Sequence, residues 1–268
     1  MTKISFPGLN IDWFEINPIA FSVFGLKIHW YGIIIALGFF LAILYCVKIK
    51  DYGNLSSDNI LDIAIFGAPS GIICARLYYV IFSFSDYKDN LWDIFKIWNG
   101  GIAIYGAVIG AVISAYIYCR VKKLNVAKVF DVCIMGVLIG QIIGRWGNFV
   151  NGEAHGGETD FILRMGLIEN GKEIFVHPTF LYESVWNIGV FFVLRKIMKN
   201  RRFDGEVFLS YLGLYSLGRV WIEGMRTDSL YLGSIRVSQL LAAVLVILSI
   251  CAIIYKLKKK NCSKEEKS

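Results

Sequence analysis

Residues 144–157 read Gly-Arg-Trp-Gly-Asn-Phe-Val-Asn-Gly-Glu-Ala-His-Gly-Gly, and they lie where an apolar stretch of membrane length ends. The stretch 132–150 carries a single charged side chain, Arg145. A guanidinium inside a transmembrane segment costs roughly 2.5–3.5 kcal/mol on insertion scales, so it marks a functional site by default. Two asparagines, a glutamate and a histidine accompany it, among glycines that allow close backbone approach. The motif therefore predicts a site that holds an anionic group at a membrane boundary.

The chain as a whole is strongly hydrophobic in composition. Of its 268 residues, 56% are hydrophobic and 18% are charged, and the mean hydropathy is +0.56. This composition is typical of a polytopic membrane protein and excludes an ordinary soluble domain. Stretches of near-membrane length with at most one formal charge are 30–47, 63–85, 97–119, 132–150, 178–194, 207–222 and 237–255. We therefore predict an all-α polytopic membrane protein, with residues 1–268 forming one domain of seven transmembrane helices.

The placement of lysine and arginine predicts the orientation. Seventeen of the 28 basic residues follow the first, third, fifth and seventh stretches, and eight lie in the N-terminal segment and the alternate loops. Because basic loops stay in the cytoplasm, the N-terminus is expected outside and the C-terminus inside. The net charge of +7 then reflects topology and contact with anionic membrane lipid. No nucleic-acid motif accompanies the basic residues, so we predict no nucleic-acid partner.

The longest loop, 151–177, falls on the predicted outer face between the fourth and fifth stretches. Within it, Asn170-Gly171 separates two strand-like runs, which is the strongest short signal for a β-hairpin. We therefore predict a small extracytoplasmic head that contains one hairpin. The six cysteines form no Cys-x-x-Cys pair and the three histidines have no metal-ligand spacing, so neither a metal nor a cofactor is expected.

A second group of polar residues lies in the sixth stretch. Tyr215, Arg219 and Glu223 are spaced i, i+4 and i+8, so they share one helix face. Taken alone, this spacing favours a simple ion pair between Arg219 and Glu223. A second arginine at similar depth, Arg145, favours a shared site instead. Two guanidiniums that face one cavity match phosphate oxygens, and at a membrane the nearest phosphate is a phospholipid headgroup.

Two further patterns indicate packing. Glycines at a spacing of four allow membrane helices to approach closely, and the fourth stretch has Gly136, Gly140 and Gly144. Arg76 in the second stretch is expected to form a structural ion pair with Glu183 or Asp62.

Together these motifs resemble the prolipoprotein diacylglyceryl transferase family of bacteria. The resemblance covers nearly the whole chain and rests on residues 29–32, 100–106, 144–153, 177–183 and 215–226. It implies a multi-pass enzyme of the bacterial cell membrane that uses no cofactor. Such an enzyme transfers the diacylglyceryl group of phosphatidylglycerol to the lipobox cysteine thiol in the signal peptide of a preprolipoprotein. Glycerol 1-phosphate is released in this first step of lipoprotein maturation.

The resemblance also implies roles for individual residues. Arg145 and Arg219 would stabilise the charge that develops on the departing phosphate. Glu153 and Glu223 would orient these arginines. The catalytic set is Arg145, Arg219, Tyr105, Glu153 and Glu223. The set that binds phosphatidylglycerol is Arg145, Asn148, Asn151, Gly156, Tyr31 and Tyr215.

The chain departs from the family pattern at Tyr105, where many members have a histidine. A tyrosine phenol ordinarily titrates near ~10 and is a poor base at neutral pH. The group that accepts the thiol proton is therefore left open. A transporter or channel is the main alternative class, because paired intramembrane charges also mark substrate pathways. Against it, the charges cluster in the outer half, and no pair of broken-helix repeats is evident.

Overall fold

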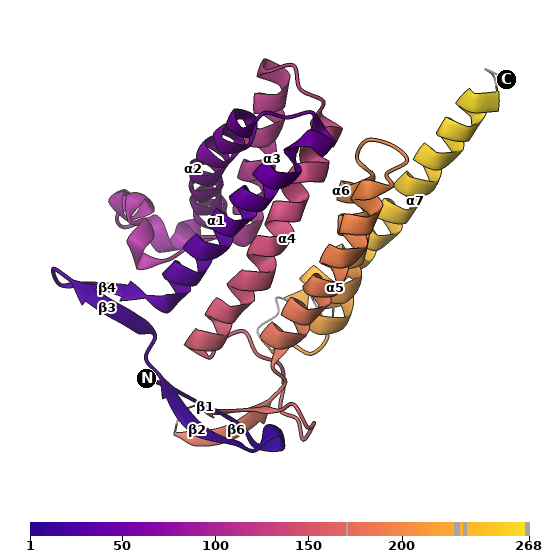
Figure 1. Cartoon of the computed structure of the whole chain (residues 1–268). Coiled ribbons are helices and arrows are strands. Elements are labelled where there is room, and N and C mark those ends of the chain that lie inside the picture. The colour runs from indigo at the N-terminus through magenta and orange to yellow at the C-terminus, as the bar shows by residue number, and fades with distance from the viewer. Residues whose placement is uncertain (170, 228–230, 233–234, 266–268) are drawn as a thin grey trace. The chain divides into compact units, whose positions relative to one another are not determined.

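The computed structural model describes residues 1–169, 171–227, 231–232 and 235–265. Seven long α-helices dominate these ranges (Figure 1). They are α1 (Trp30–Ile49), α2 (Ser57–Phe82), α3 (Ile104–Val121), α4 (Val126–Asn151), α5 (Thr179–Lys199), α6 (Glu206–Glu223) and α7 (Val237–Glu265). Each helix overlaps one of the stretches predicted from the sequence, so the prediction of mainly helical structure is confirmed.

Five of the helices in the described ranges are long and apolar enough to cross a membrane: α1, α2, α3, α4 and α7. Helices α5 and α6 have 21 and 18 residues but are not among these five. Both bury polar or charged side chains, including Glu183 and Asn187 on α5 and Glu223 on α6. The chain is therefore a multi-pass membrane protein by helix length and composition, and the count of seven spans stays a prediction.

The chain divides into two compact units. The larger unit comprises Met1–Tyr45 and Cys133–Ser268, and the smaller unit comprises Cys46–Val132. The boundaries fall inside α1 and α4. In the larger unit α6 contacts both α5 and α7 (Figure 1). The single domain over residues 1–268 stays a prediction.

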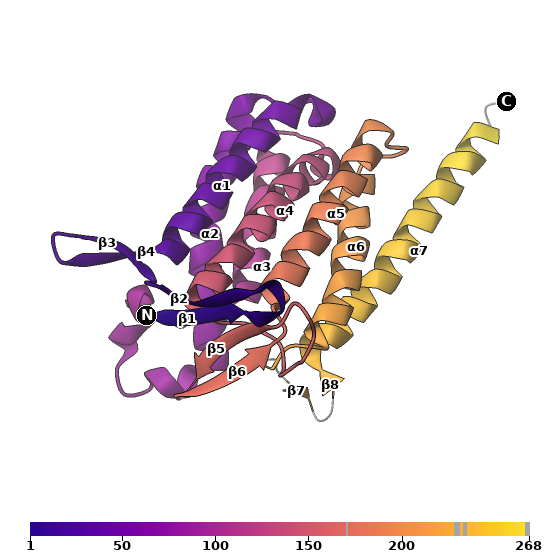
Figure 2. The same cartoon turned by 60° about the horizontal axis from the view of Figure 1, so that its bottom comes forward.

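The larger unit carries a four-stranded antiparallel sheet with strand order β2-β1-β5-β6 (Figure 2). Its strands are β1 (Thr2–Phe6), β2 (Ile11–Ile16), β5 (Met165–Glu169) and β6 (Lys172–Val176). The pairing of β5 with β6 confirms the predicted hairpin, whereas Asn170 lies outside the described residues. Ile4 of β1 packs in a buried cluster with Met165, Leu167 and the first turn of α5 at Phe180. The sheet is thus built from two hairpins, and the sequence predicted only one.

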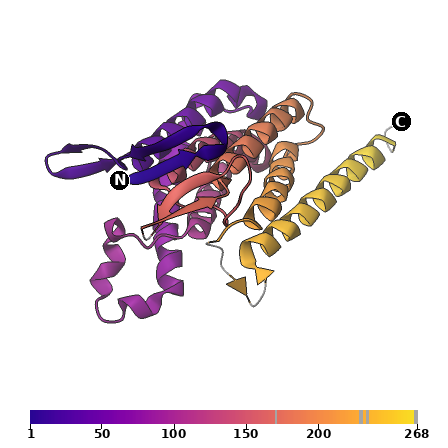
Figure 3. The same cartoon turned by 90° about the horizontal axis from the view of Figure 1, so that it is seen from below.

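A separate hairpin joins the N-terminal strands to α1. It consists of β3 (Ile19–Val23) and β4 (Leu26–His29), and it projects away from the rest of the larger unit (Figure 3). Its turn residues Phe24 and Gly25 have φ values of 50° and 83°. Positive φ at both positions is the geometry of a type I′ turn, which usually contains Asn-Gly. Because Phe-Gly lacks that signature, the sequence did not predict this hairpin. A short pair, β7 (Tyr231–Leu232) and β8 (Ile235–Arg236), precedes α7.

Glycines set the closest helix approaches within each unit. In the smaller unit, a Cβ added at Gly106 of α3 would lie 2.6 Å from Tyr78 Cβ and 2.8 Å from Ala75 Cα on α2. In the larger unit, a Cβ added at Gly38 of α1 would lie 3.7 Å from Gly140 Cα on α4. Small residues therefore allow α2 to pack on α3 and α1 on α4.

Arg76 binds backbone carbonyls, so the predicted ion pair is wrong. Its guanidinium is buried in the smaller unit and donates four hydrogen bonds of 2.6–2.7 Å. The acceptors are the carbonyl oxygens of Asp93, Ile94, Gly100 and Gly101. Asp62 instead accepts a hydrogen bond from the Tyr118 hydroxyl at 2.7 Å. Arg76 thus holds the segment before α3 in an irregular conformation, and α3 begins at Ile104 rather than at residue 97.

Candidate active site

Two arginines from different helices share one buried carboxylate in the larger unit. Arg145 Nη2 on α4 lies 2.6 Å from Glu183 Oε1 on α5, and Arg219 Nη1 on α6 lies 2.9 Å from Glu183 Oε2. The Glu183 side chain is 2% exposed, whereas those of Arg145 and Arg219 are 22% and 17% exposed. The two arginine side chains are therefore partly accessible, and the carboxylate that fixes them is buried.

Glu183 is the site residue that the sequence interpretation missed. It was assigned only a structural ion pair with Arg76, but it bonds to both arginines of the predicted phosphate site. The available signal was a lone carboxylate in an apolar stretch, which has to find a cationic partner. Helix α5 is positioned by its start, where the Thr179 hydroxyl donates to the carbonyl oxygen of Ala154 at 2.6 Å.

Arg219 lies between two carboxylates. Besides Glu183, it forms an ion pair with Glu223 one turn along α6. Glu223 also accepts a hydrogen bond of 2.6 Å from the Ser238 hydroxyl on α7. Tyr215 contributes its hydroxyl, which lies 3.4 Å from Glu183 Oε1. The predicted pairing of Arg219 with Glu223 is therefore present, and it forms part of a network that links α4, α5, α6 and α7.

The end of α4 adds two amides and a carboxylate. Arg145 Nη1 donates to Asn148 Oδ1 at 3.3 Å. Asn148 and Asn151 donate to the same oxygen of Glu153, at 3.1 and 3.3 Å. Gly152, with φ of 65°, reverses the chain after the helix and brings Glu153 back over the last turn. Glu153 therefore contacts the asparagines, and it reaches Arg145 through Asn148.

Gly156 lies where the loop after α4 passes between two helix ends. Its N–H donates to the carbonyl oxygen of His177 at 2.9 Å, and the N–H of Gly157 donates to that of Met225 at 2.8 Å. A Cβ at position 156 would lie 2.7 Å from His177 Cβ and 3.0 Å from the Met225 oxygen. The loop thus joins the end of α4 to the start of α5 and to the segment that follows α6.

The two remaining predicted residues lie in different units. The Tyr31 ring, at the start of α1, packs on Gly147 of α4, where an added Cβ would lie 2.7 Å from the ring. Tyr31 thus lies against the turn of α4 that carries Arg145. Tyr105 belongs to the smaller unit, at the first turn of α3, and its ring centroid lies 6.3 Å from that of Tyr78. The structure therefore connects all predicted site residues except Tyr105 within one unit.

The cluster can bind a phosphate group. Each guanidinium has five N–H donors, and the bonds to Glu183, Asn148 and Glu223 use only part of them. The remaining donors are on side chains that are partly accessible. Arginine pairs bind phosphate oxygens in bidentate geometry. Among the described residues, no group of three or more His, Cys, Asp or Glu side chains has the geometry of a metal site.

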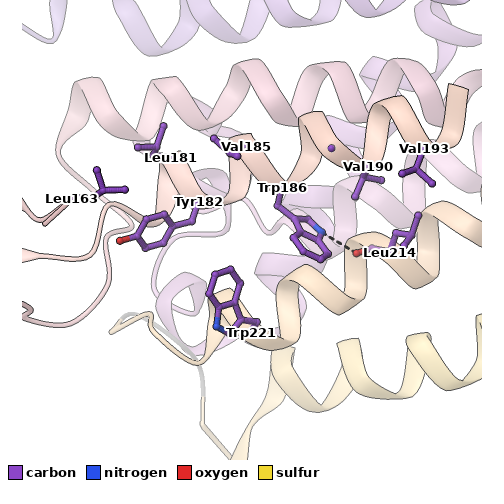
Figure 4. Close-up of a pocket in the computed structure, with 10 residues that line it drawn as sticks. Leu163, Leu181, Tyr182, Val185, Trp186, Val190, Val193, Leu214 and Trp221 are labelled. Carbon is purple, nitrogen blue, oxygen red and sulfur yellow. Dashed lines mark hydrogen bonds between the residues drawn. The ribbon is translucent and has the colours of Figure 1, made fainter. Parts of the chain in front are cut away.

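An apolar groove with a volume of about 450 Å³ lies between α5 and α6 (Figure 4). Its lining includes Tyr182, Val185, Trp186, Val193, Leu214 and Trp221. The Trp186 N–H donates to the Leu214 carbonyl at 3.0 Å, and the Tyr182 hydroxyl lies 3.2 Å from His177 Nδ1. Because its lining is almost entirely apolar, the groove suits hydrocarbon rather than chemistry. The candidate active site is therefore the arginine cluster.

The chain is similar to known proteins over most of its length. Residues 18–255 match the family model of prolipoprotein diacylglyceryl transferase. A phosphatidylglycerol–prolipoprotein diacylglyceryl transferase of Clostridioides difficile (strain 630) is 47% identical over 245 residues, covering 91% of this chain and 97% of its own. A protein of the same name from Clostridium botulinum (strain Langeland) is 48% identical over 251 residues, covering 91% and 99%. Another, from Listeria welshimeri, is 46% identical over 257 residues, covering 92% of each chain. This chain therefore belongs to the prolipoprotein diacylglyceryl transferase family.

Proposed function

We propose that this protein transfers the diacylglyceryl group of phosphatidylglycerol to the lipobox cysteine of preprolipoproteins. The single observation that carries the proposal, beside family membership, is the pair of arginines held on Glu183. A phospholipid headgroup brings the phosphate that such a pair binds. Both arginine side chains are partly accessible, whereas the carboxylate that holds them is buried.

The reaction is a substitution at the primary glyceryl carbon that bears the phosphate. A carbon–sulfur bond forms, the carbon–oxygen bond to phosphate breaks, and glycerol 1-phosphate leaves with the bonding electron pair. The thiol loses its proton. The developing charge on the phosphate oxygens is stabilised by Arg145 and Arg219, which act as preorganised electrostatic groups. Because Glu183 and Glu223 hold the two side chains in place, little reorganisation is needed when the charge develops.

The remaining residues position the lipid. Asn148 contacts Arg145, and Asn151 shares a Glu153 oxygen with Asn148. We therefore assign both amides to the headgroup, with Tyr31 and Tyr215 alongside. Glu153 orients these amides. Gly156 acts indirectly. Its N–H donates to the His177 carbonyl oxygen, and its lack of a side chain lets the loop pass close to the start of α5. The hydrocarbon chains of the lipid require an apolar surface, which the groove between α5 and α6 provides.

The membrane arrangement follows from the charge pattern. We propose that α5 and α6 also cross the bilayer, giving seven spans in the bacterial cell membrane. The basic segments after α1, α3, α5 and α7 would lie in the cytoplasm with the C-terminus. The N-terminus and the sheet that includes β5 and β6 would then lie outside, on the side where the lipobox cysteine of an exported protein arrives.

The experiment that tests this function uses purified protein in micelles containing phosphatidylglycerol. A lipobox peptide is supplied, together with the same peptide carrying serine in place of cysteine. Mass spectrometry should find the diacylglyceryl mass on the cysteine peptide alone, and an enzymatic assay should find an equal amount of glycerol phosphate. Folded protein that yields neither product with several phospholipids would overturn the proposal.

Tyr105→Phe tests whether a phenol accepts the thiol proton. We expect turnover to fall less than about tenfold, because a phenol is a poor base and a true general base contributes roughly 100–10,000-fold. Tyr78→Phe is the matched control, since it removes a hydroxyl from the neighbouring ring. A fall of more than about 100-fold in Tyr105→Phe alone, with the protein folded, would assign the proton to this residue.

A further inference from the structure

Asn187 on α5 is completely buried, and its amide has no partner within the described part of the chain. The residue is 0% exposed, and neither Oδ1 nor Nδ2 makes a hydrogen bond to the protein. Buried polar side chains are hydrogen-bonded in the large majority of cases. An amide in this position therefore indicates a small polar ligand that the protein itself does not supply.

The position of Asn187 on its helix directs it toward the active site. It follows Glu183 by one turn, so the two residues are ~40° apart around the helix axis. Ser184, ~100° from Glu183, donates its hydroxyl to the Ile142 carbonyl of α4 at 3.1 Å. Asn187 lies between these two directions. Its side chain therefore leaves α5 on the face that α4 and α6 cover, one turn below the shared carboxylate.

The neighbouring helices have polar residues at the same depth. Gln141 precedes Arg145 by one turn on α4, and Tyr211 precedes Tyr215 by one turn on α6. The Tyr211 hydroxyl donates to Gln141 Oε1 at 3.0 Å. With Asn187, these residues form what we call the second polar layer, beneath Arg145, Glu183 and Arg219.

The second polar layer is also the last one on this face of α5. Val190 and Leu194 continue the face, and they are 4% and 0% exposed. A ligand at Asn187 therefore has an apolar floor below it and the carboxylate above it. Hydrogen-bonding side chains are available from the second polar layer and from the active site, and the complete burial of Asn187 requires the ligand to be small.

We propose that Asn187 holds an ordered water molecule that also donates a hydrogen bond to the Glu183 carboxylate. A buried water typically makes about three hydrogen bonds to polar groups that otherwise lack partners. Each carboxylate oxygen has two lone pairs, and Glu183 Oε2 accepts from Arg219, which leaves room for the water. Asn187 is then a positioning residue that acts through the water on Glu183 and, through Glu183, on both arginines. This role rests on the proposed transferase function, whereas the water site does not.

Asn187→Leu tests the water site, because leucine has the same number and branching of side-chain heavy atoms as asparagine but no polar atoms. If the site exists, the variant deprives the buried carboxylate of a partner, so the unfolding midpoint should fall. If Asn187 truly has no partner, leucine removes an unsatisfied amide and the midpoint should rise. A higher midpoint in the variant would therefore overturn the proposal without any measurement of activity.

Steady-state kinetics test the positioning role. Asn187→Leu should lower kcat about tenfold and change KM for phosphatidylglycerol less than about twofold, since the guanidiniums remain but are held less firmly. Asn187→Gln, which keeps the amide, should recover part of the loss. The matched control is Ser184→Ala, which removes a buried hydrogen bond outside the second polar layer and should leave kcat unchanged. An unchanged kcat in Asn187→Leu would overturn the positioning role.

An experimental structure of the wild-type protein, at a resolution that shows ordered water, gives an answer even if Asn187→Leu fails to fold. A density peak within ~3 Å of both the Asn187 amide and Glu183 is expected. An empty position there overturns the water site. Loss of the proposed function would show instead as wild-type protein without transfer activity, whatever the density at Asn187.

Discussion

Arg145→Ala and Arg219→Ala are each expected to lower diacylglyceryl transfer by at least about 1,000-fold. Removing a single donor from a preorganised electrostatic site costs roughly 100–1,000-fold in kcat. Each arginine supplies several donors and a full charge, so the larger loss is expected. The alanine variants also leave Glu183 with only one of its two cationic partners.

The lipobox-peptide assay measures this loss. The variants Arg145→Lys and Arg219→Lys separate the contribution of the charge from that of the bidentate geometry. Lysine keeps the charge but cannot bind phosphate in bidentate geometry, so intermediate rates are expected. Arg195→Ala is the matched control, because it removes an exposed arginine from the opposite end of α5. Near-normal turnover in either alanine variant, at normal membrane insertion, would refute the assignment of the phosphate site.

Glu183→Gln is the second change with a large expected effect. Glutamine keeps the size of the side chain but leaves two guanidiniums facing a neutral amide, so they repel each other. Breaking a buried ion pair by removing one partner costs about 3–5 kcal/mol. We expect a loss of transfer of at least about 100-fold, with a lower unfolding midpoint.

The matched control for this change is Glu206→Gln. Glu206 is equally buried at the start of α6, and it pairs with Arg202 at 2.6 Å. Its replacement should lower the unfolding midpoint while leaving kcat nearly unchanged. If both variants lost activity in proportion to stability, Glu183 would be a structural residue and not part of the active site.

The helices could be predicted from the sequence because hydropathy and helix length are local properties. The stretch 132–150 lies within α4, and 237–255 lies within α7. The third stretch was placed too early because residues 97–103 carry no charge but lie outside the helix, where Arg76 binds the carbonyls of Gly100 and Gly101. That contact joins residues about 25 positions apart, and no local pattern shows it. The pairing of β1 with β5 is even more distant in sequence.

The candidate site was predictable on each helix separately. The patterns that predicted it each lie within a single helix. They are the spacing of Tyr215, Arg219 and Glu223 on α6 and that of Arg145 and Asn148 on α4. Glu183 was not recognised because its role depends on the side-by-side placement of α4, α5 and α6, and periodicity gives no information about neighbouring helices. Asn187 was missed for a related reason, since one asparagine in an apolar stretch has no distinctive spacing.

The shared carboxylate also bears on how the protein enters the membrane during synthesis. Each of the stretches 132–150 in α4 and 178–194 at α5, alone in hydrocarbon, would expose one uncompensated charge at roughly 2.5–3.5 kcal/mol, and the ion pair between Arg145 and Glu183 compensates both. The two helices are consecutive, joined by the residues that form β5 and β6. With α5 spanning the bilayer as proposed, this cost is removed from both helices once they lie side by side in the membrane. The contact that shapes the candidate active site therefore also favours the insertion of α4 and α5 as a pair.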